Sequence, residues 1–541
     1  MESLAADLRT MVRTPLHPDH IEAMRRLGTE EVIAAGAFLY HAGDVQDRLC
    51  HVLDGELEAV DARTGARYGG ATLGPGQFFG DISFLSGSAL QFGARAVSPT
   101  RLLCVPRAAM LALMARMPEM SDIIITVLAA RRRRLLESGE ASLTLIGAEA
   151  DRTIREIASF AGRNRIPYRS LTLDEHEAEV VAGQCALGGV RPAVIFGKGE
   201  VIADPTPRKL AARLGLDLTF DAEEVHDVLI VGGGPAGVAA AVYAGSEGLA
   251  ALVLEDLAIG GQAGTSSRIE NYMGFPTGIS GADLCWRGEV QAMKFGTRFA
   301  VPRRASGLAL RDDGTFCVTL DDGSETSARA LVVATGVQYR RLPLDRLEDF
   351  ESAGIYYAAT DVEARWCRDA EVAVIGGGNS AGQAAMFLAR TARHVHVLVR
   401  GPSLAASMSR YLSDRIEAHP RITVHYGTRM TALHGDGTLE AVTIRTDGAQ
   451  PAERRLETPA VFVMVGAAPN TSWLSGHVAL DDKGFVLTGP AAGARSAYAT
   501  SQPGIYAVGD VRAGSVKRVA SAVGEGSVVI SEVWGHLNPP E

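Results

Sequence analysis

The stretch DVLIVGGGPAGVAAAVYAGSEGLAALVLE, residues 227–255, decides the fold of the larger part of this chain. An apolar segment leads into Gly232, Gly234 and Gly237. A run of small residues follows, and then a second apolar segment that ends at Glu255. This order predicts a strand, a glycine-rich turn, a helix and a second strand, which is typical of a dinucleotide-binding unit.

The residue types in this stretch suit a dinucleotide. The glycines permit a tight turn, close approach of the backbone to a pyrophosphate and close packing of the helix. Pro235 and Ala236 open the helix, whose amino terminus offers free amides and the positive end of the helix dipole. Glu255 is placed to accept hydrogen bonds from ribose hydroxyls.

A second unit of the same kind is EVAVIGGGNSAGQAAMFLARTARHVHVLVRG, residues 371–401. Its second strand ends at Arg400 instead of an acid. A guanidinium pairs with a ribose 2′-phosphate that an acid would repel, so this unit favours NADPH over NADH. The alternative is that Arg400 is a solvated strand end. The candidate residues here are Gly376, Gly378, Asn379, Ser380, Ala381 and Arg400.

Two dinucleotide units, one with an acid and one with an arginine, predict a flavin in the first and a nicotinamide in the second. Two later segments agree with this assignment. In LVVATGVQYRRLP a predicted strand precedes Thr335 and Gly336, and in GIYAVGDVRAG another precedes Gly509 and Asp510. Asp510 is placed to reach a ribityl hydroxyl or a water on the pyrophosphate. We therefore predict FAD and NADPH as cofactors.

Composition narrows the class of protein. The 541 residues carry a net charge of −10, which argues against a nucleic-acid-binding protein. The amino terminus has no basic stretch before an apolar one, so we expect no secretory signal and a cytoplasmic location. The longest uncharged stretch, 228–246, contains the glycine-rich turn, and we expect no membrane span.

The cysteines show no CxxC pair and no metal-ligand spacing. We therefore expect neither a disulfide framework nor a metal site. They are Cys50, Cys104, Cys185, Cys285, Cys317 and Cys367.

Residues 1–140 carry short alternating segments separated by glycine turns, followed by helical periodicity. This order resembles a cyclic-nucleotide-binding domain, with its short cassette at FFGDISFLSG. The resemblance implies a ribose contact at a Gly-Glu pair, which Gly80 and Asp81 match. The region where the family carries its phosphate-binding arginine reads Ala89, Leu90 and Gln91.

Without that guanidinium a cyclic phosphate loses its bidentate partner, unless the register slips and Arg95 takes its place. We therefore expect that cyclic nucleotide is not the ligand, and that the domain is a docking or regulatory module. The four-arginine run Arg131–Arg134 is interpreted as a solvated helix end, with an anion or partner site as the alternative.

Residues 141–222 change to the order strand, helix, strand, helix, strand, strand, helix. This order resembles a thioredoxin or glutaredoxin unit, with Pro192 where that family keeps a cis-proline. The position after the first strand, where the family carries its dithiol, reads GAEADRT and has no thiol. Cys185 lies in a predicted loop. The unit is interpreted as a spacer or docking surface.

Residues 226–541 resemble the low-molecular-weight thioredoxin reductases of the pyridine nucleotide-disulfide oxidoreductase superfamily. The motifs that carry the resemblance are GGGPAG, GGQAGTSSRIENYMGFP, ATG, GGGNSAG and GIYAVGDVRAGSVKRVASAVGEG. The resemblance implies a homodimer, and it implies further flavin contacts at Gly261, Gln262, Asn271, Lys517, Arg518 and Val519.

The largest departure from that family is chemical. The reductases hold a CxxC just before the second glycine motif, where this chain reads Ala358, Ala359, Thr360 and Asp361. A disulfide needs two thiols, and Cys367 stands alone in this segment. We expect no thioredoxin reduction by the usual dithiol relay. The whole chain resembles the subgroup of thioredoxin-reductase-like proteins with a cyclic-nucleotide-binding domain.

The predicted fold is multidomain: an all-β roll with closing helices, an α/β thioredoxin-like unit, and a reductase with two Rossmann-type domains. The predicted domains are 1–140, resembling cyclic-nucleotide-binding domains; 141–222, thioredoxin- or glutaredoxin-like without a dithiol; 223–340 and 466–541, FAD-binding; and 341–465, NAD(P)H-binding.

The predicted function is transfer of a hydride from NADPH to FAD and then to an unidentified acceptor: a small redox protein, a quinone or oxygen. The hydride step needs stacking and orientation, so no catalytic acid or base is assigned. The family's domains rotate, and Gly336 and Gly466 mark the expected hinge. Two alternatives remain, a flavin or NADPH sensor acting through the amino-terminal domain, and a disulfide reductase using thiols such as Cys367.

Overall fold

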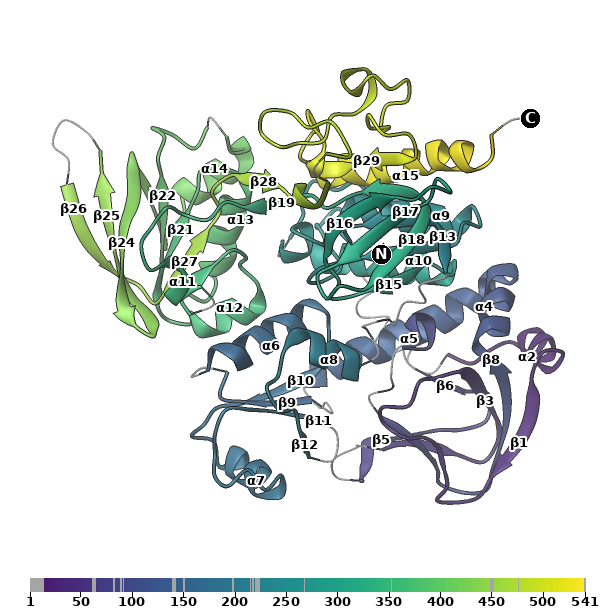
Figure 1. The fold of residues 1–541 in the computed structure, drawn as a ribbon. Coiled ribbons are helices and arrows are strands. Elements are labelled where there is room, and N and C mark those ends of the chain that lie inside the picture. Colours follow the sequence, from purple (N-terminus) through teal and green to yellow (C-terminus); the bar gives the residue numbers. More distant parts are fainter. Residues whose placement is uncertain are drawn as a thin grey trace.

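The computed structural model divides into four units, and Figure 1, coloured along the sequence from purple to yellow, shows the yellow carboxyl-terminal segment returning to the teal unit around β13 and β18. A β-roll comes first, a small α/β unit second, and two larger α/β domains follow, named here the first and second dinucleotide domains. The predicted multidomain fold class is confirmed. The residues described are 14–60, 65–80, 83–87, 90, 92–138, 143–148, 151–196, 199–214, 216, 218, 224–266, 268–351, 353–405, 407–447, 452–474 and 476–539.

Two four-stranded antiparallel sheets form the β-roll, in the orders β1-β8-β3-β6 and β2-β7-β4-β5. Their alternating apolar residues face one another across the core. The elements are α2 (Pro18–Arg25), β1 (Thr29–Ile33), β2 (Phe38–Tyr40), β3 (Arg48–Asp54), β4 (Leu57–Val60), β5 (Arg67–Leu73), β6 (Phe78–Phe79), α3 (Ser83–Ser86), β7 (Gly93–Ala96), β8 (Thr100–Pro106), α4 (Arg107–Arg116) and α5 (Pro118–Ser138).

The closing helices α4 and α5 share a core with the first dinucleotide domain. Met114 and Ile124 from these helices are fully buried in one cluster with Val290 and Met293 of the first dinucleotide domain. Burial of such side chains stabilises an interface by about 1.5–3 kcal/mol each. The β-roll is therefore packed onto the reductase half through apolar contacts.

The β-roll contains a disulfide between Cys50 on β3 and Cys104 on β8, with a Cα–Cα distance of 4.2 Å. The expectation of no disulfide was wrong. The strand register places the two residues directly opposite each other although 54 residues separate them. Spacing rules detect neighbouring cysteines and do not see partners across an antiparallel pair.

The small α/β unit has the predicted order of elements. Its sheet runs β10-β9-β11-β12, with β9 and β10 parallel and β11 antiparallel to β9. The peptide bond before Pro192 is not cis, contrary to expectation, and the cis bond found in the described residues is Val301–Pro302. The elements are β9 (Leu143–Ile146), α6 (Arg152–Arg163), β10 (Tyr168–Leu171), α7 (His176–Gln184), β11 (Ala193–Phe196), β12 (Glu200–Val201) and α8 (Pro207–Arg213).

The first dinucleotide domain is built on a sheet in the order β15-β14-β13-β18-β17-β16, with β29 paired to β18. Helices α9 and α15 pack closely because small residues line their contact: a Cβ on Gly526 would lie 2.1 Å from the Ala236 carbonyl oxygen. The elements are β13 (Val225–Val231), α9 (Pro235–Ser246), β14 (Ala251–Leu254), α10 (Gly281–Lys294), β15 (Arg298–Ala300), β16 (Ala305–Leu310), β17 (Phe316–Leu320), β18 (Glu325–Val333), β29 (Ile505–Ala507) and α15 (Val519–Leu537).

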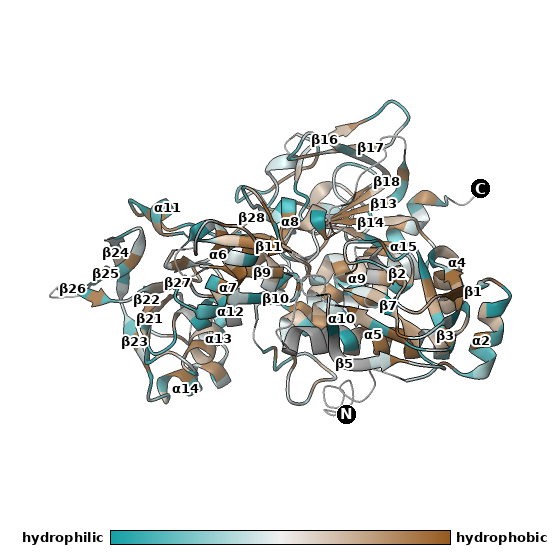
Figure 2. Ribbon diagram, turned by 90° about the horizontal axis from the view of Figure 1, so that it is seen from below, coloured by the Kyte–Doolittle hydropathy of each residue, from teal (hydrophilic) through white to brown (hydrophobic). Residues whose placement is uncertain are grey.

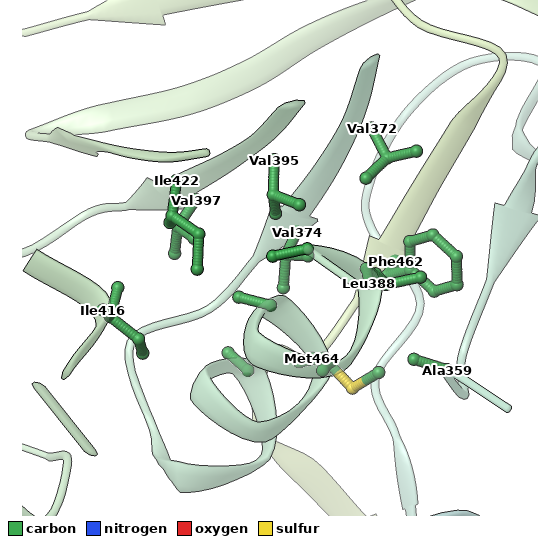
Figure 3. Close-up of a cluster of buried hydrophobic side chains, with 14 of the residues drawn as sticks. Ala359, Val372, Val374, Leu388, Val395, Val397, Ile416, Ile422, Phe462 and Met464 are labelled. Carbon is green, nitrogen blue, oxygen red and sulfur yellow. The ribbon is translucent and has the colours of Figure 1, made fainter. Parts of the chain in front are cut away.

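The second dinucleotide domain has a parallel sheet in the order β20-β27-β21-β22-β23 and a three-stranded antiparallel sheet of β24, β25 and β26. Its core is drawn in Figure 3. The elements are α11 (Leu347–Phe350), β20 (Ile355–Tyr356), α12 (Asp361–Trp366), β21 (Glu371–Ile375), α13 (Asn379–Leu388), β22 (His394–Val399), α14 (Arg410–Glu417), β23 (Ile422–Tyr426), β24 (Thr428–Asp436), β25 (Thr438–Thr446), β26 (Ala452–Glu457) and β27 (Ala460–Val463).

The chain passes between these two domains through a short antiparallel pair, β19 (Val337–Tyr339) and β28 (Ala467–Pro469). Gly336 and Gly466 next to this pair have positive φ angles of +59° and +53°, with open space where a Cβ would stand. Two such residues at the crossing are suited to absorb a change of backbone angle.

Hydropathy follows this architecture. Strands β13, β14 and β18 are brown in Figure 2, as expected for a parallel sheet covered on both faces. Among the described helices, none combines the length and the apolar character that crossing a membrane requires.

Candidate functional site

The first glycine turn, 232–237, lies at the carboxyl end of β13, where dinucleotide folds place their ligand. Gly232 has φ +111°, and a Cβ there would lie 2.3 Å from the Ala334 carbonyl oxygen. A Cβ on Gly237 would lie 1.8 Å from the Gly232 carbonyl oxygen. Gly234 faces open space. The turn is therefore closed on the protein side and open on the side where a pyrophosphate would approach.

The Glu255 side chain holds the backbone of this turn by hydrogen bonds. Its carboxylate accepts hydrogen bonds from the backbone N–H of Gly233 at 2.7 Å, of Leu257 at 3.0 Å and of Ala258 at 3.3 Å. Burial raises the pKa of Glu255 to about 7, and the amides oppose that shift. Both oxygens are engaged by backbone, so Glu255 shapes the turn, and its predicted contact with a ribose stays a prediction.

The second glycine turn, 376–381, repeats this geometry after β21. Gly376 has φ +142°, and a Cβ there would lie 2.5 Å from the Met464 carbonyl oxygen. Ala381 is buried directly beneath it. Among the described residues, the Ser407 carbonyl oxygen alone lies within 4 Å of a Cβ position on Gly378, at 3.8 Å. This turn, too, leaves its outer side accessible.

The polar residues around the second turn are exposed. The Asn379 side chain accepts a hydrogen bond from the Ser409 N–H at 2.7 Å, which fixes the loop before α14. Ser380 is exposed at the start of α13, and Arg400 is exposed directly after β22. An exposed arginine here is available to a 2′-phosphate, so both interpretations of Arg400 remain open.

The loop after β14 folds back onto the first turn. Gly261 has φ +51°, and its Cβ position is 3.2 Å from the Gly234 Cα. The Gln262 side-chain amide donates to the Val337 carbonyl oxygen at the crossing strand β19. Asn271 is exposed instead, beside Glu270, which pairs with Arg415 of α14 at 3.2 Å. Gly261 and Gln262 thus join the site, whereas Asn271 faces the boundary between the two domains.

The strand ends predicted to complete the site are brought to the first turn. Thr335 donates its hydroxyl to the Asn470 carbonyl oxygen at 2.8 Å, next to Gly336. Gly509 has φ +73°, and its Cβ position is 3.0 Å from the Ala236 Cβ, so Asp510 follows directly beside the start of α9. Burial raises the pKa of Asp510, while Lys517 lowers it.

Sequence reasoning missed the residue that positions Asp510. Glu525 on α15 is 8% exposed and accepts the Gly509 N–H at 2.6 Å. It also pairs with Arg512 at 2.8 Å. The available signal was a single acid inside the apolar run AVGEGSVV, because a charge on a buried helix face needs a specific partner.

The amino-terminal end of α15 carries the remaining predicted flavin contacts. Arg518 occupies the N-cap position of the helix without a side-chain capping hydrogen bond and is exposed, and Val519 is half-buried at the first helical position. Lys517 is exposed, with its ammonium 5.2 Å from the centre of the Phe485 ring. These residues lie beside the first turn, and their contact with a flavin stays a prediction.

The segment that aligns with the absent CxxC is part of a hydrophobic core. Ala359 is buried in one cluster with Leu388 and Phe462, which Figure 3 shows together. The Thr360 N–H donates to Glu363 at 2.9 Å, so this acid, which sequence reasoning also missed, caps α12. Burial raises the pKa of the Cys367 thiol to about 12. A thiol so protonated is a poor nucleophile.

The small α/β unit lies over this segment and touches both dinucleotide domains. Its helix α6 packs against α12 of the second domain, and Arg152 donates to the Glu348 carbonyl oxygen at 3.3 Å. Toward the first domain, Arg165 pairs with Asp283 at 2.6 Å and Asn164 donates to the Leu257 carbonyl oxygen at 2.9 Å. The unit therefore bridges the two domains across the hinge.

In the β-roll, the arginine that starts the four-arginine run is half-buried and contacts other parts of the unit. Arg131 donates to the Gly80 carbonyl oxygen at 2.7 Å and lies 5.2 Å over the Phe78 ring, so that interpretation was wrong for this residue. Long-range packing of α5 on the cassette brings them together. Arg95 donates to Glu58 at 2.8 Å. Asp81, Ala89 and Gln91 lie outside the described residues.

Two glycine turns of one geometry, each at the carboxyl end of a parallel sheet, define a protein that holds two dinucleotides in one chain. Residues 226–526 match the family described as pyridine nucleotide-disulphide oxidoreductase, and the chain belongs to that family. Residues 30–117 match the cyclic nucleotide-binding domain. The chain is an FAD-dependent NADPH oxidoreductase by family, and FAD and NADPH are its cofactors.

The individual proteins to which the chain is similar are consistent with this family. The chain is 34% identical to NADPH-dependent thioredoxin reductase 3 of Arabidopsis thaliana, over 57% of each protein. It is also 34% identical to the thioredoxin reductase of Mycolicibacterium smegmatis, over 58% of this chain and 97% of that one. The structure resembles the thioredoxin reductase of Lactococcus lactis in its FR conformation, with a TM-score of 0.53, 27% identity, and coverage of 58% and 99%.

Proposed function

We propose that this protein passes electrons from NADPH through FAD to an acceptor other than a protein disulfide, and that its amino-terminal units regulate this transfer. The observation that carries the proposal is the segment Ala358–Asp361, which has no thiol, is partly buried and is overlain by the small α/β unit. FAD, when bound, supplies the redox chemistry by accepting a hydride from NADPH.

The chain's own residues bind and orient the two cofactors. The open sides of Gly234 and Gly378 admit the two pyrophosphates, and the amides at the starts of α9 and α13 face them. Asp510, positioned by Glu525 through Gly509, would hold a ribityl hydroxyl of the flavin or a water on its pyrophosphate. Arg400 takes the 2′-phosphate of NADPH. Gly336 and Gly466 would allow the two domains to rotate, which would bring a bound nicotinamide to the flavin.

The acceptor is a small redox protein, a quinone or oxygen. A disulfide reductase that uses other thiols is the second candidate, and it is favoured by the thioredoxin reductase names of the relatives. The free cysteines of the described residues weaken it, because Cys285 and Cys367 are buried with pKa values raised to about 12. A thiol relay needs an accessible thiolate.

The amino-terminal units act as protein modules and not as carriers of electrons or cyclic nucleotides. Arg95, the one substitute considered for the phosphate-binding arginine, is engaged by Glu58. The thioredoxin-like unit takes the place of a partner at the segment that lost its dithiol. A flavin or NADPH sensor that signals through the β-roll is the remaining alternative. A homodimer and a cytoplasmic location complete the proposal.

An anaerobic titration of the purified protein with NADPH, followed by the visible absorption of the flavin, tests the proposal. We expect bleaching near about one equivalent and much slower bleaching with NADH. Oxygen, a soluble quinone and oxidised thioredoxin are then offered separately to the reduced protein. Reoxidation by oxygen or quinone supports the proposal, and fast reoxidation by thioredoxin contradicts it. A flavin that stays oxidised with NADPH favours the sensor.

The variant Cys367→Ser separates the two catalytic candidates. We expect its rate of flavin reduction and its reoxidation by quinone to match those of the unchanged protein, because the thiol is buried and protonated. Cys185→Ser, which changes a half-buried thiol on another unit, is the matched control. Loss of acceptor turnover in Cys367→Ser alone, with flavin content retained, would establish the thiol relay instead.

A further inference from the structure

A cavity of about 560 Å³ lies where the small α/β unit meets both dinucleotide domains. Residues 162–165 at the end of α6 form one wall, and Ala359, Thr360 and Arg390 of the second domain form another. The loop 258–266 and α10 of the first domain complete it. A volume of this size is ordinary for a small-molecule site. No described residue of the turns 232–237 or 376–381 lines it, but Gly261 does, so the cavity adjoins the first dinucleotide site at the loop 258–266.

The cavity contains a guanidinium without a partner. Among the described residues, Arg163 makes no hydrogen bond and no ion pair, and burial lowers its pKa. The carboxylates of Glu255, Asp256 and Glu363 act on it only from a distance. Arg163 is half-buried, and a partly desolvated cation without a hydrogen-bonding partner is unfavourable, because it has lost part of its hydration without a replacement. A bound anion would remove this cost.

Other groups in the same walls fit an anion that carries a ring. Arg390 lies 5.9 Å from the centre of the Phe387 ring, and no side-chain hydrogen bond engages it. Arg165 lies 5.1 Å over the Trp286 ring, where its pair with Asp283 already neutralises it. Both rings are half-buried and line the cavity. The walls thus offer the half-buried Arg163 and the exposed Arg390, neither of them engaged by a side-chain hydrogen bond from the described residues, beside two aromatic rings.

The acidic side chains in the cavity walls do not neutralise Arg163 and Arg390. Asp283 is held by Arg165 at 2.6 Å, and the remaining acid in the walls is Glu289, which has interactions of its own. Two unpaired guanidinium groups match a doubly charged phosphate monoester better than a singly charged carboxylate. The aromatic faces favour a flat ring over an aliphatic chain.

We propose that this three-domain cavity binds a small phosphate monoester with a flat ring, whose phosphate is held by Arg163 and Arg390 and whose ring lies against Trp286 and Phe387. Each of the three units contributes contacts to the ligand, so binding fixes the second dinucleotide domain relative to the first. The ligand therefore sets the population of the domain arrangement from which the hydride is transferred.

The test is calorimetric titration of phenyl phosphate into the full chain loaded with FAD, with inorganic phosphate and benzoate as separate probes. We expect phenyl phosphate to bind with one site per chain, more tightly than either of the other probes. Arg163→Gln and Arg390→Gln should each weaken its binding by about 10-fold or more, the loss expected for a charged hydrogen bond. Arg191→Gln, an exposed arginine on the same unit, is the matched control and should bind unchanged.

Three results would overturn the proposal: no binding of phenyl phosphate, equal binding to the protein and to Arg163→Gln, or benzoate binding as tightly as phenyl phosphate. The flavin content and melting temperature of each variant are measured first. Loss of FAD from Arg163→Gln would assign that arginine to the flavin and also overturn the proposal. Because binding is read without NADPH or an acceptor, failure here leaves the proposed oxidoreductase function untouched.

Discussion

The two glycine turns share one backbone geometry and differ in the residue at the end of the second strand of each unit. In both, a glycine of positive φ approaches a carbonyl oxygen of the neighbouring crossing segment, Ala334 in the first domain and Met464 in the second. The residue at the end of the second strand differs: Glu255 is buried under three amides, whereas Arg400 is exposed. The first site is built in advance for a resident group, and the second is open for a group that exchanges.

Substitution at the first turn should give the largest effect. Gly232→Ala places a Cβ 2.3 Å from the Ala334 carbonyl oxygen at φ +111°, and backbone strain alone costs roughly 1–3 kcal/mol. We expect purified protein without FAD and with a lowered melting temperature. Gly234→Ala, which meets nothing within 4 Å, is the control and should fold normally with weaker FAD binding. Normal FAD content in Gly232→Ala would refute this account of the turn.

Charge reversal at the second turn should change cofactor choice. Arg400→Glu removes the guanidinium and adds an acid, so we expect NADPH to bind about 10-fold or more weakly while NADH gains relative to it. Rates of flavin reduction measured against the concentration of each nucleotide provide the check. Arg368→Glu, an exposed arginine before the strands of the same sheet, is the control. An unchanged preference would make Arg400 a solvated strand end.

The buried Glu255 of the first domain should make the stability of the protein depend on pH. Burial raises the folded pKa of Glu255 from 4.5 to about 7, so the folded protein holds this proton more firmly than the unfolded chain. Its contribution to stability is therefore present at low pH and is lost as the pH rises through this window. In the FAD-free protein, the difference in melting temperature between the unchanged chain and Glu255→Gln should shrink from pH 4.5 to 7. A constant difference would contradict the shift.

The second domain should respond to pH with the opposite sign and a smaller effect. His425 lies 3.0 Å from His396, and burial together with Arg454 lowers its pKa from 6.5 to about 4. The unfolded chain takes up this proton first, so stability is lost as the pH falls from 6.5 toward 4. Melting temperatures of the unchanged protein and His425→Gln should converge on acidification. A difference between the two melting temperatures that does not change on acidification would contradict the lowered pKa.

The parts that sequence reasoning predicted are those that local chemistry controls. Gly232 and Gly376 were assigned from spacing, because only glycine adopts their backbone angles and admits such close contact. The element order of the small α/β unit was also predicted, since the periodicity of buried residues changes with each element. The absence of a thiol at Ala358–Asp361 needed no structure at all.

The parts that it missed depend on partners far away along the chain. Cys50 and Cys104 pair because two strands share a register, and Arg131 meets Gly80 because α5 returns to the cassette. Glu525 supports the Gly509 backbone across 16 residues, and its role is invisible until α15 packs beside α9. Spacing within one segment carries no information about such contacts.

The sequence by itself determined two dinucleotide units, their cofactors and the loss of the dithiol, because glycine conformations and thiol chemistry reside in single residues. The tertiary structure alone decided that the small α/β unit covers Ala359 and Thr360, and that Arg163 lines a cavity among three units without a partner in the described part of the chain. Such placements follow from how separate units pack, and packing surfaces are assembled from residues hundreds of positions apart.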